Sequence, residues 1–88
     1  MKQELKNNKL SQNAVTEWEL VLFNDTTNSF EHVIGALMKC CNHGIYQAEQ
    51  CATIAHYKGR CSIKRGDYKS LLDISFDLKS HDLKTEII

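Results

Sequence analysis

The chain has 88 residues, with 11 basic and 11 acidic side chains, so its formal net charge is zero. The length predicts one domain with a modest core. The charge balance argues against a general nucleic-acid-binding or membrane-surface role, because both rely on excess positive charge. No apolar run approaches the roughly 18 residues of a transmembrane helix, and the first residues do not resemble a signal peptide. We therefore expect neither nucleic acid nor a membrane as a partner.

Residues 1–16 are polar and are dominated by Lys, Gln, Asn and Ser. Burial of so little apolar surface does not offset the entropy lost on ordering. We therefore expect a flexible N-terminal extension over residues 1–16, followed by a folded core domain over residues 17–88. On composition alone the extension is either an idle tail or an arm that handles a partner.

The first predicted element is a strand over residues 17–23, EWELVLF, which begins with alternation and ends in a continuous apolar run. The turn that follows, Asn24-Asp25-Thr26-Thr27, contains no glycine. A simple turn would be served by Gly or Pro. Side chains that all end in hydrogen-bonding groups indicate either a dense helix-capping knot or a small polar site.

A helix is predicted over residues 29–41. Asn28 followed by Glu31 has the form of a capping residue with a carboxylate three positions later. The apolar residues that recur at helical spacing are Phe30, Val33, Ile34, Leu37 and Cys41. The triplet Asn42-His43-Gly44 ends this helix, and Gly44 is the residue expected to adopt the left-handed conformation.

A second helix is predicted over residues 45–56, with Gly59 just beyond its end. Its apolar stripe consists mainly of small residues: Ile45, Ala48, Cys51, Ala52 and Ala55. Small residues either allow another element to approach closely or leave room for a ligand.

The rest of the chain predicts a short strand over residues 60–64, a turn at Arg65-Gly66 and a third helix capped by Asp67. The expected buried face of that helix is Tyr68, Leu71, Leu72, Ser75 and Leu78. Residues 82–88 alternate and suit an edge strand. The predicted fold class is therefore α/β (α+β): a two-layer sandwich in which a three-stranded, mainly antiparallel sheet packs against three helices, in the order β-α-α-β-α-β.

The four cysteines are Cys40, Cys41, Cys51 and Cys61. An even number is compatible with disulfides, but only in an oxidising compartment, and nothing in the sequence signals secretion. No Cys-x2-Cys knuckle indicates a zinc site. We expect buried reduced thiols, a cytoplasmic location, and no metal or other cofactor.

An enzyme is not expected. The sequence contains no glycine-rich phosphate-binding motif and no nucleophile elbow. Cys51 or Cys61 could pair with His56 as a nucleophile and base. Cys51, however, lies on the apolar stripe, and Cys61 has no evident activating neighbour.

His56 lies in the last turn predicted for the second helix. It can satisfy carbonyl groups at the helix C-terminus, where the helix dipole favours a histidine. A neutral histidine can equally accept a hydrogen bond from a cationic donor. Spacing alone leaves both interpretations open.

The runs LVLFNDTTNSFEHVIGAL and AHYKGR together resemble the ClpS family, over about residues 17–88. The matching positions are Asn24-Asp25, Glu31 and the segment His56-Tyr57-Lys58-Gly59-Arg60. The resemblance implies an adaptor that binds N-degrons, which are proteins with a hydrophobic or aromatic first residue, and delivers them to a Clp AAA+ unfoldase of the ClpA or ClpC kind. It also implies that a flexible N-terminal extension assists the transfer. We expect a monomer.

The resemblance further implies a binding site. The substrate α-amino group would lie against Asn24, Asp25, Thr26 and His56. The first side chain of the substrate would enter a hydrophobic pocket that maps to Phe30, Val33, Ala52, Ala55 and Leu83.

Three features depart from the family pattern. Thr26 replaces a second aspartate and so removes a charge that would strengthen amine binding. Phe30 replaces a methionine at the pocket mouth, and two larger apolar residues are replaced by Ala52 and Ala55. These departures motivate an alternative, namely a ClpS-like interaction module that docks on the unfoldase and modulates substrate choice without binding N-degrons.

Overall fold

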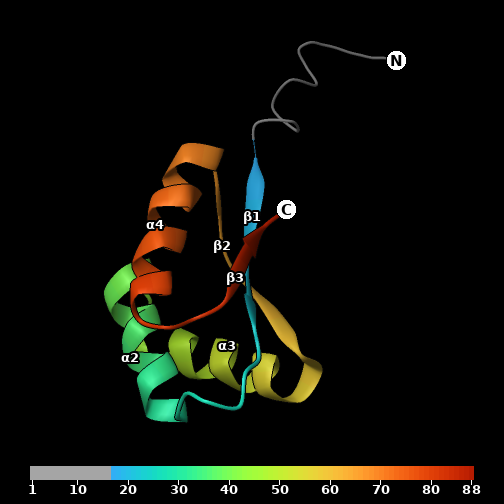
Figure 1. Cartoon of the computed structure of the whole chain (residues 1–88), viewed down its shortest axis with the longest axis vertical. Helices are drawn as coiled ribbons and strands as arrows, with labels where there is room; N and C mark the ends of the chain where they lie inside the picture. Colours follow the sequence, from blue (N-terminus) through green and yellow to red (C-terminus); the bar gives the residue numbers. More distant parts are fainter. Residues whose placement is uncertain (1–16) are drawn as a thin grey trace.

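The computed structural model describes residues 17–88, so the predicted flexible extension over residues 1–16 lies outside the described residues. The elements are β1 (Trp18–Phe23), α2 (Phe30–Cys41), α3 (Ile45–Lys58), β2 (Arg60–Gly66), α4 (Tyr68–Ser80) and β3 (Thr85–Ile87). Their order, β-α-α-β-α-β, confirms the predicted architecture (Figure 1).

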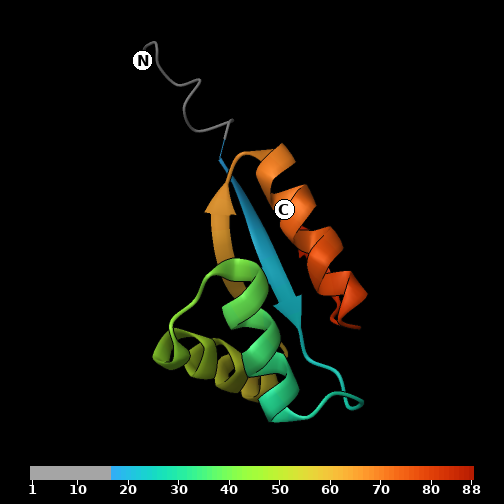
Figure 2. The same ribbon diagram turned by 90° about the vertical axis from the view of Figure 1, so that its left-hand side faces the viewer.

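The sheet has three strands in the order β2-β1-β3, and both pairings are antiparallel. The apolar strand β1 is therefore central, and β3 is an edge strand as predicted. Figure 2 shows α2 and α4 on the viewer's side of the strands, which gives the two-layer arrangement. The register of β1 against β2 shifts between Leu20 and Val21, a β-bulge that increases the local twist.

The core lies between the sheet and the helices. Its most buried large side chains are Leu20, Leu22, Leu37, Leu71 and Leu78. Helix α3 contributes only small buried residues, Ala48, Cys51, Ala52 and Ala55. These short side chains let α3 approach α2 and β2 closely.

All four cysteines are free thiols. Cys41, Cys51 and Cys61 are buried as predicted, whereas Cys40 is only half-buried. Burial raises the pKa of Cys41 to about 11, and burial together with the neighbouring Cys61 raises the pKa of Cys51 to about 12. Both thiols therefore stay protonated at neutral pH.

Two helix ends differ from the prediction. The N-cap of α2 is Ser29 and not Asn28, because the Ser29 hydroxyl accepts the hydrogen bond from the amide of His32. The left-handed residue after α2 is Asn42, with φ 59°, and Gly44 instead serves as the extended N-cap of α3. Asn is the residue other than Gly that tolerates this conformation best.

The other helix ends agree better. Gly59 follows α3 with φ 95°, a conformation that favours glycine, although α3 continues to Lys58 rather than ending at residue 56. Asp67 caps α4 as predicted, by accepting a hydrogen bond from the amide of Ser70.

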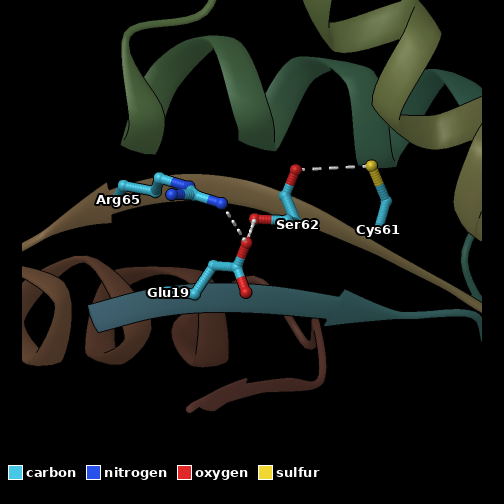
Figure 3. Close-up of polar contacts among 4 residues, drawn as sticks. All are labelled: Glu19, Cys61, Ser62 and Arg65. Carbon is cyan, nitrogen blue, oxygen red and sulfur yellow. Dashed lines mark hydrogen bonds and ion pairs between the residues drawn. The ribbon is translucent and has the colours of Figure 1, made fainter. Parts of the chain in front are cut away.

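The predicted turn at Arg65-Gly66 is wrong, because β2 continues through both residues. Arg65 pairs with Glu19 on the neighbouring strand, at 3.1 Å between Nη2 and Oε2, and Ser62 Oγ donates to the same carboxylate at 2.9 Å (Figure 3). These cross-strand contacts extend the ladder beyond the predicted strand end.

Two predicted apolar faces are also partly wrong. Ile45, which opens the stripe of α3, is 58% exposed. On α4, Leu71 and Leu78 are buried, but Tyr68 and Leu72 are each nearly half exposed. The helical period was assigned correctly in both cases, but the buried stripe is narrower than the apolar one.

Candidate functional site

A small pocket opens where the β1–α2 turn, the start of α2, the end of α3 and the α4–β3 loop meet. Its volume is about 40 Å³. Its walls are formed by Leu22, Phe23, Asn24, Asp25, Asn28, Phe30, Val33, Ala52, Ala55, His56 and Leu83. Every predicted site residue except Thr26 lines this pocket, so the structure brings together residues that are far apart in the sequence.

Asp25 is the centre of the β1–α2 turn. Its Oδ1 accepts hydrogen bonds from the amides of Thr27 and Asn28, both at 2.9 Å, and from the Thr27 hydroxyl at 3.3 Å. Its Oδ2 accepts from Asn28 Nδ2 at 3.0 Å. The glycine-free turn is therefore held by a carboxylate hub, in the manner of an Asx turn.

These contacts also set the charge of Asp25. Partial burial raises the pKa of its carboxyl, but the hydrogen bonds from Asn28 and Thr27 outweigh burial, and the net pKa lies below its ordinary value. A fixed negative charge therefore lies in the pocket wall at neutral pH. Thr26 is exposed beside this hub and does not face the pocket.

The turn is tied to the end of α3 by its backbone. The Asn24 amide donates to the carbonyl of Gly59 at 2.9 Å. Gly59 can accept in this position because its left-handed conformation turns the chain sharply from α3 into β2. This one bond brings Asn24 and His56 to the same pocket.

His56 presents an imidazole ring to the pocket from the last turn of α3. The ring packs edge-to-face against Phe30, with centroids 6.0 Å apart, and against Tyr57, with centroids 4.9 Å apart. Within residues 17–88, neither ring nitrogen of His56 has a hydrogen-bond partner, and the Ala55 carbonyl is satisfied by the Gly59 amide. The geometry thus favours an outward-facing acceptor over a helix-capping histidine.

The apolar part of the pocket has a small-residue floor and an aromatic rim. Ala52 and Ala55 are almost completely buried, and Leu83 is 4% exposed. Phe30 is 42% exposed and stands at the mouth. A ligand side chain that entered here would be desolvated by short aliphatic groups below and by an aromatic ring at the entrance.

Sequence reasoning missed three wall residues, Leu22, Phe23 and Asn28. Leu22 and Phe23 close the strand that leads into the turn, so their place next to Asn24 was a usable signal. Asn28 was assigned to the helix cap instead. Its three-residue spacing from Asp25 was compatible with the contact that it actually makes.

Other kinds of site find no support in the part of the chain that is described. Residues 17–88 contain no group of three or more potential metal ligands. No helix in that range is long and apolar enough to cross a membrane. The protonated state of Cys51 does not favour a thiol nucleophile.

Comparisons with known proteins agree with the pocket geometry. Residues 13–86 match the model of the family described as "ATP-dependent Clp protease adaptor protein ClpS". The chain is also similar to "E3 ubiquitin-protein ligase UBR1" from Homo sapiens and from Mus musculus, at 34% identity over 61 residues in each case. The match covers 69% of this chain but only 4% of each ligase. On the strength of the family match, the chain belongs to the ClpS family of Clp protease adaptors.

Proposed function

We propose that this protein binds the free N-terminus of proteins whose first residue is hydrophobic or aromatic, and that it delivers them to a Clp AAA+ unfoldase of the ClpA or ClpC kind. The observation that carries the proposal is a single pocket that joins an anionic, acceptor-rich rim to an apolar floor. An N-terminal residue presents the complementary pair, a cationic amine next to a side chain.

Each group in the rim has a proposed role. A neutral His56 accepts one hydrogen bond from the α-amino group through a ring nitrogen. The Asn24 amide oxygen accepts a second one, while its NH2 group is available to the first carbonyl of the substrate. Asp25 supplies negative potential, and because its oxygens already hold the turn it acts mainly through that charge.

Capture of the first residue is the part of the proposal that the two kinds of relative could share. One is an adaptor of an ATP-dependent protease and the other is a ubiquitin ligase, and a common element would have to act before their destinations diverge. Delivery to the unfoldase, a cytoplasmic location, a monomeric state and the absence of catalysis complete the proposal by family membership.

Fluorescence anisotropy with two labelled peptides tests the proposal. Both begin with Phe, and they differ only in acetylation of the α-amino group. We expect the free amine to bind and the acetylated peptide to lose most of its affinity, because a buried acceptor left without its cationic donor is costly. Equal binding of both peptides would refute amine recognition.

A second candidate function is favoured by one feature of the rim. Thr26 removes a charge, and the Asp25 carboxylate is committed to the turn. A ClpS-like module that docks on the unfoldase and alters its substrate choice would need no amine site. Recovery of the unfoldase in a pull-down, together with the absence of binding to either peptide, would favour this function.

A further inference from the structure

Two side chains at the beginning of α2 hold the loop that connects α4 to β3. Asn28 Nδ2 donates to the carbonyl of Asp82 at 2.9 Å, and His32 Nε2 donates to the carbonyl of His81 at 2.7 Å. Asn28 and His32 are four positions apart, so they lie on the same side of the start of the helix. Two consecutive carbonyls of the loop are thus bound from one turn of chain.

The loop that they hold is sharply bent. Asp82 has φ 66°, a left-handed conformation that a residue other than glycine seldom adopts. The amides of Asp82 and Leu83 turn back to the carbonyls of Lys79 and Leu78 at 2.9 and 3.0 Å. Leu83 emerges from this bend directly into the pocket wall, where it is 4% exposed.

Asn28 also connects the loop to the anionic rim. The same Nδ2 group that donates to Asp82 donates to Asp25 Oδ2 at 3.0 Å. One amide therefore spans the Asp25 hub on one side of the pocket and the loop that carries Leu83 on the other.

We infer that Asn28 and His32 are positioning residues that fix the distance between the amine-binding rim and Leu83, and thereby set which first side chains the pocket accepts. This inference rests on the proposed function. The pocket is small, about 40 Å³, so even a slight retreat of Leu83 changes its volume by a large fraction.

The direction of the effect follows from packing. When the loop is released, Leu83 can move outward and the pocket widens. A leucine side chain then loses contact with the far wall, because a gap of about 0.5–1 Å already forfeits a quarter to a half of the dispersion energy at that wall. A tryptophan side chain is large enough to span the wider pocket. Loss of either hydrogen bond should therefore shift selectivity from Leu towards Trp.

The test uses the full chain and two free-amine peptides that begin with Leu or Trp. Asn28→Ala and His32→Ala should weaken binding of the Leu peptide roughly three- to tenfold, as expected for loss of one hydrogen bond, and weaken the Trp peptide less. His32→Gln should restore selectivity, because its amide can donate to the same carbonyl. Equal losses for both peptides in the two alanine variants would overturn the inference.

Ser29→Ala is the matched control, since Ser29 is adjacent to Asn28 but only caps α2. It should lower the urea midpoint of unfolding and leave the Leu-to-Trp ratio unchanged. A change of that ratio equal to the change in Asn28→Ala would show that general destabilisation is the cause and would overturn the positioning role.

A measurement without peptide separates this inference from the proposed function. Hydrogen exchange at the Leu83 amide should accelerate about three- to tenfold in Asn28→Ala and in His32→Ala, in line with loss of one hydrogen bond, and stay unchanged in Ser29→Ala. If the wild-type chain bound neither peptide, the proposed function would fail, and the inferred selectivity with it. Unchanged Leu83 exchange in both variants would instead show that the two side chains do not hold the loop.

Discussion

Two histidines lie at opposite ends of α3 and have opposite environments. His43 precedes the helix and is 6% exposed, with its Nε2 donating to the carbonyl of Ile63 at 2.9 Å. His56 closes the helix, is exposed, and has no hydrogen-bond partner at its ring within residues 17–88. The first residue joins the α2–α3 connection to β2, and the second is available to a ligand.

The difference arises from what passes each helix end. Strand β2 runs past the α2–α3 connection, so a backbone carbonyl in the core meets the His43 ring. At the other end the chain turns away at Gly59, and only side chains of the pocket rim face His56. An acceptor needed for binding must be left without an internal partner, whereas a donor needed for folding must have one.

The largest expected effect is on folding, through His43. His43→Ala should lower the free energy of unfolding by about 2–4 kcal/mol, because it leaves a cavity and an unpaired buried carbonyl. Urea unfolding followed by circular dichroism measures this. Below its unfolding transition the variant should retain peptide affinity close to that of the wild type, and a selective loss of affinity would blur the distinction between the two histidines.

A second effect on folding should appear at alkaline pH. Burial raises the pKa values of Cys41 and Cys51 to about 11 and about 12, above the value of 9.0 for an ordinary thiol. The folded state therefore binds these protons more tightly than the unfolded state, and the resulting stability is present below pH 9 and is lost as the pH rises towards 12. Urea midpoints at pH 8 and pH 10.5 should differ less in Cys51→Ala than in the wild type. An identical pH dependence in both would contradict the buried-thiol account.

The next effect is confined to binding. His56→Ala should weaken binding of a free-amine Phe peptide by about 1–3 kcal/mol, since the amine loses a partner in a desolvated site. Its stability should change by less than about 0.5 kcal/mol, as expected for an exposed side chain. Lys58→Ala, two residues away and also exposed, is the control and should change neither quantity. Unchanged affinity in His56→Ala would remove this residue from the site.

The smallest effect concerns the rim. Thr26→Asp should strengthen binding of the same peptide by only about 0.2–1 kcal/mol, because Thr26 is exposed and lies outside the pocket wall, where a charge is screened. The gain should shrink as the salt concentration rises. A gain that exceeded tenfold and was insensitive to salt would mean that residue 26 contacts the amine directly.

The local signals in the sequence identified most of the fold. The apolar run of β1, the cap at Asp67 and the turn at Gly59 each depend on neighbouring residues, and each was predicted correctly. The errors have non-local causes. Arg65 continues β2 because Glu19 lies opposite it, and the burial of His43 depends on a carbonyl twenty residues further along the chain.

The candidate site shows the same division. Residue types and the family resemblance identified the members of the pocket, including Leu83, which lies more than fifty residues from Asn28. They did not reveal that the Asp25 carboxylate is used up by the turn, or that Asn28 holds the α4–β3 loop. Both facts depend on the direction in which a side chain points once distant segments have met.

The most direct test of the account is a nuclear magnetic resonance titration of the ¹⁵N-labelled chain with a free-amine Phe peptide. The account predicts that the largest shifts occur at the amides of Asn24, Ala55, His56 and Leu83, while those of His43 and Ile63 stay nearly unchanged. Shifts centred on His43 and the α2–α3 connection, or no shifts at the pocket at saturating peptide, would contradict it.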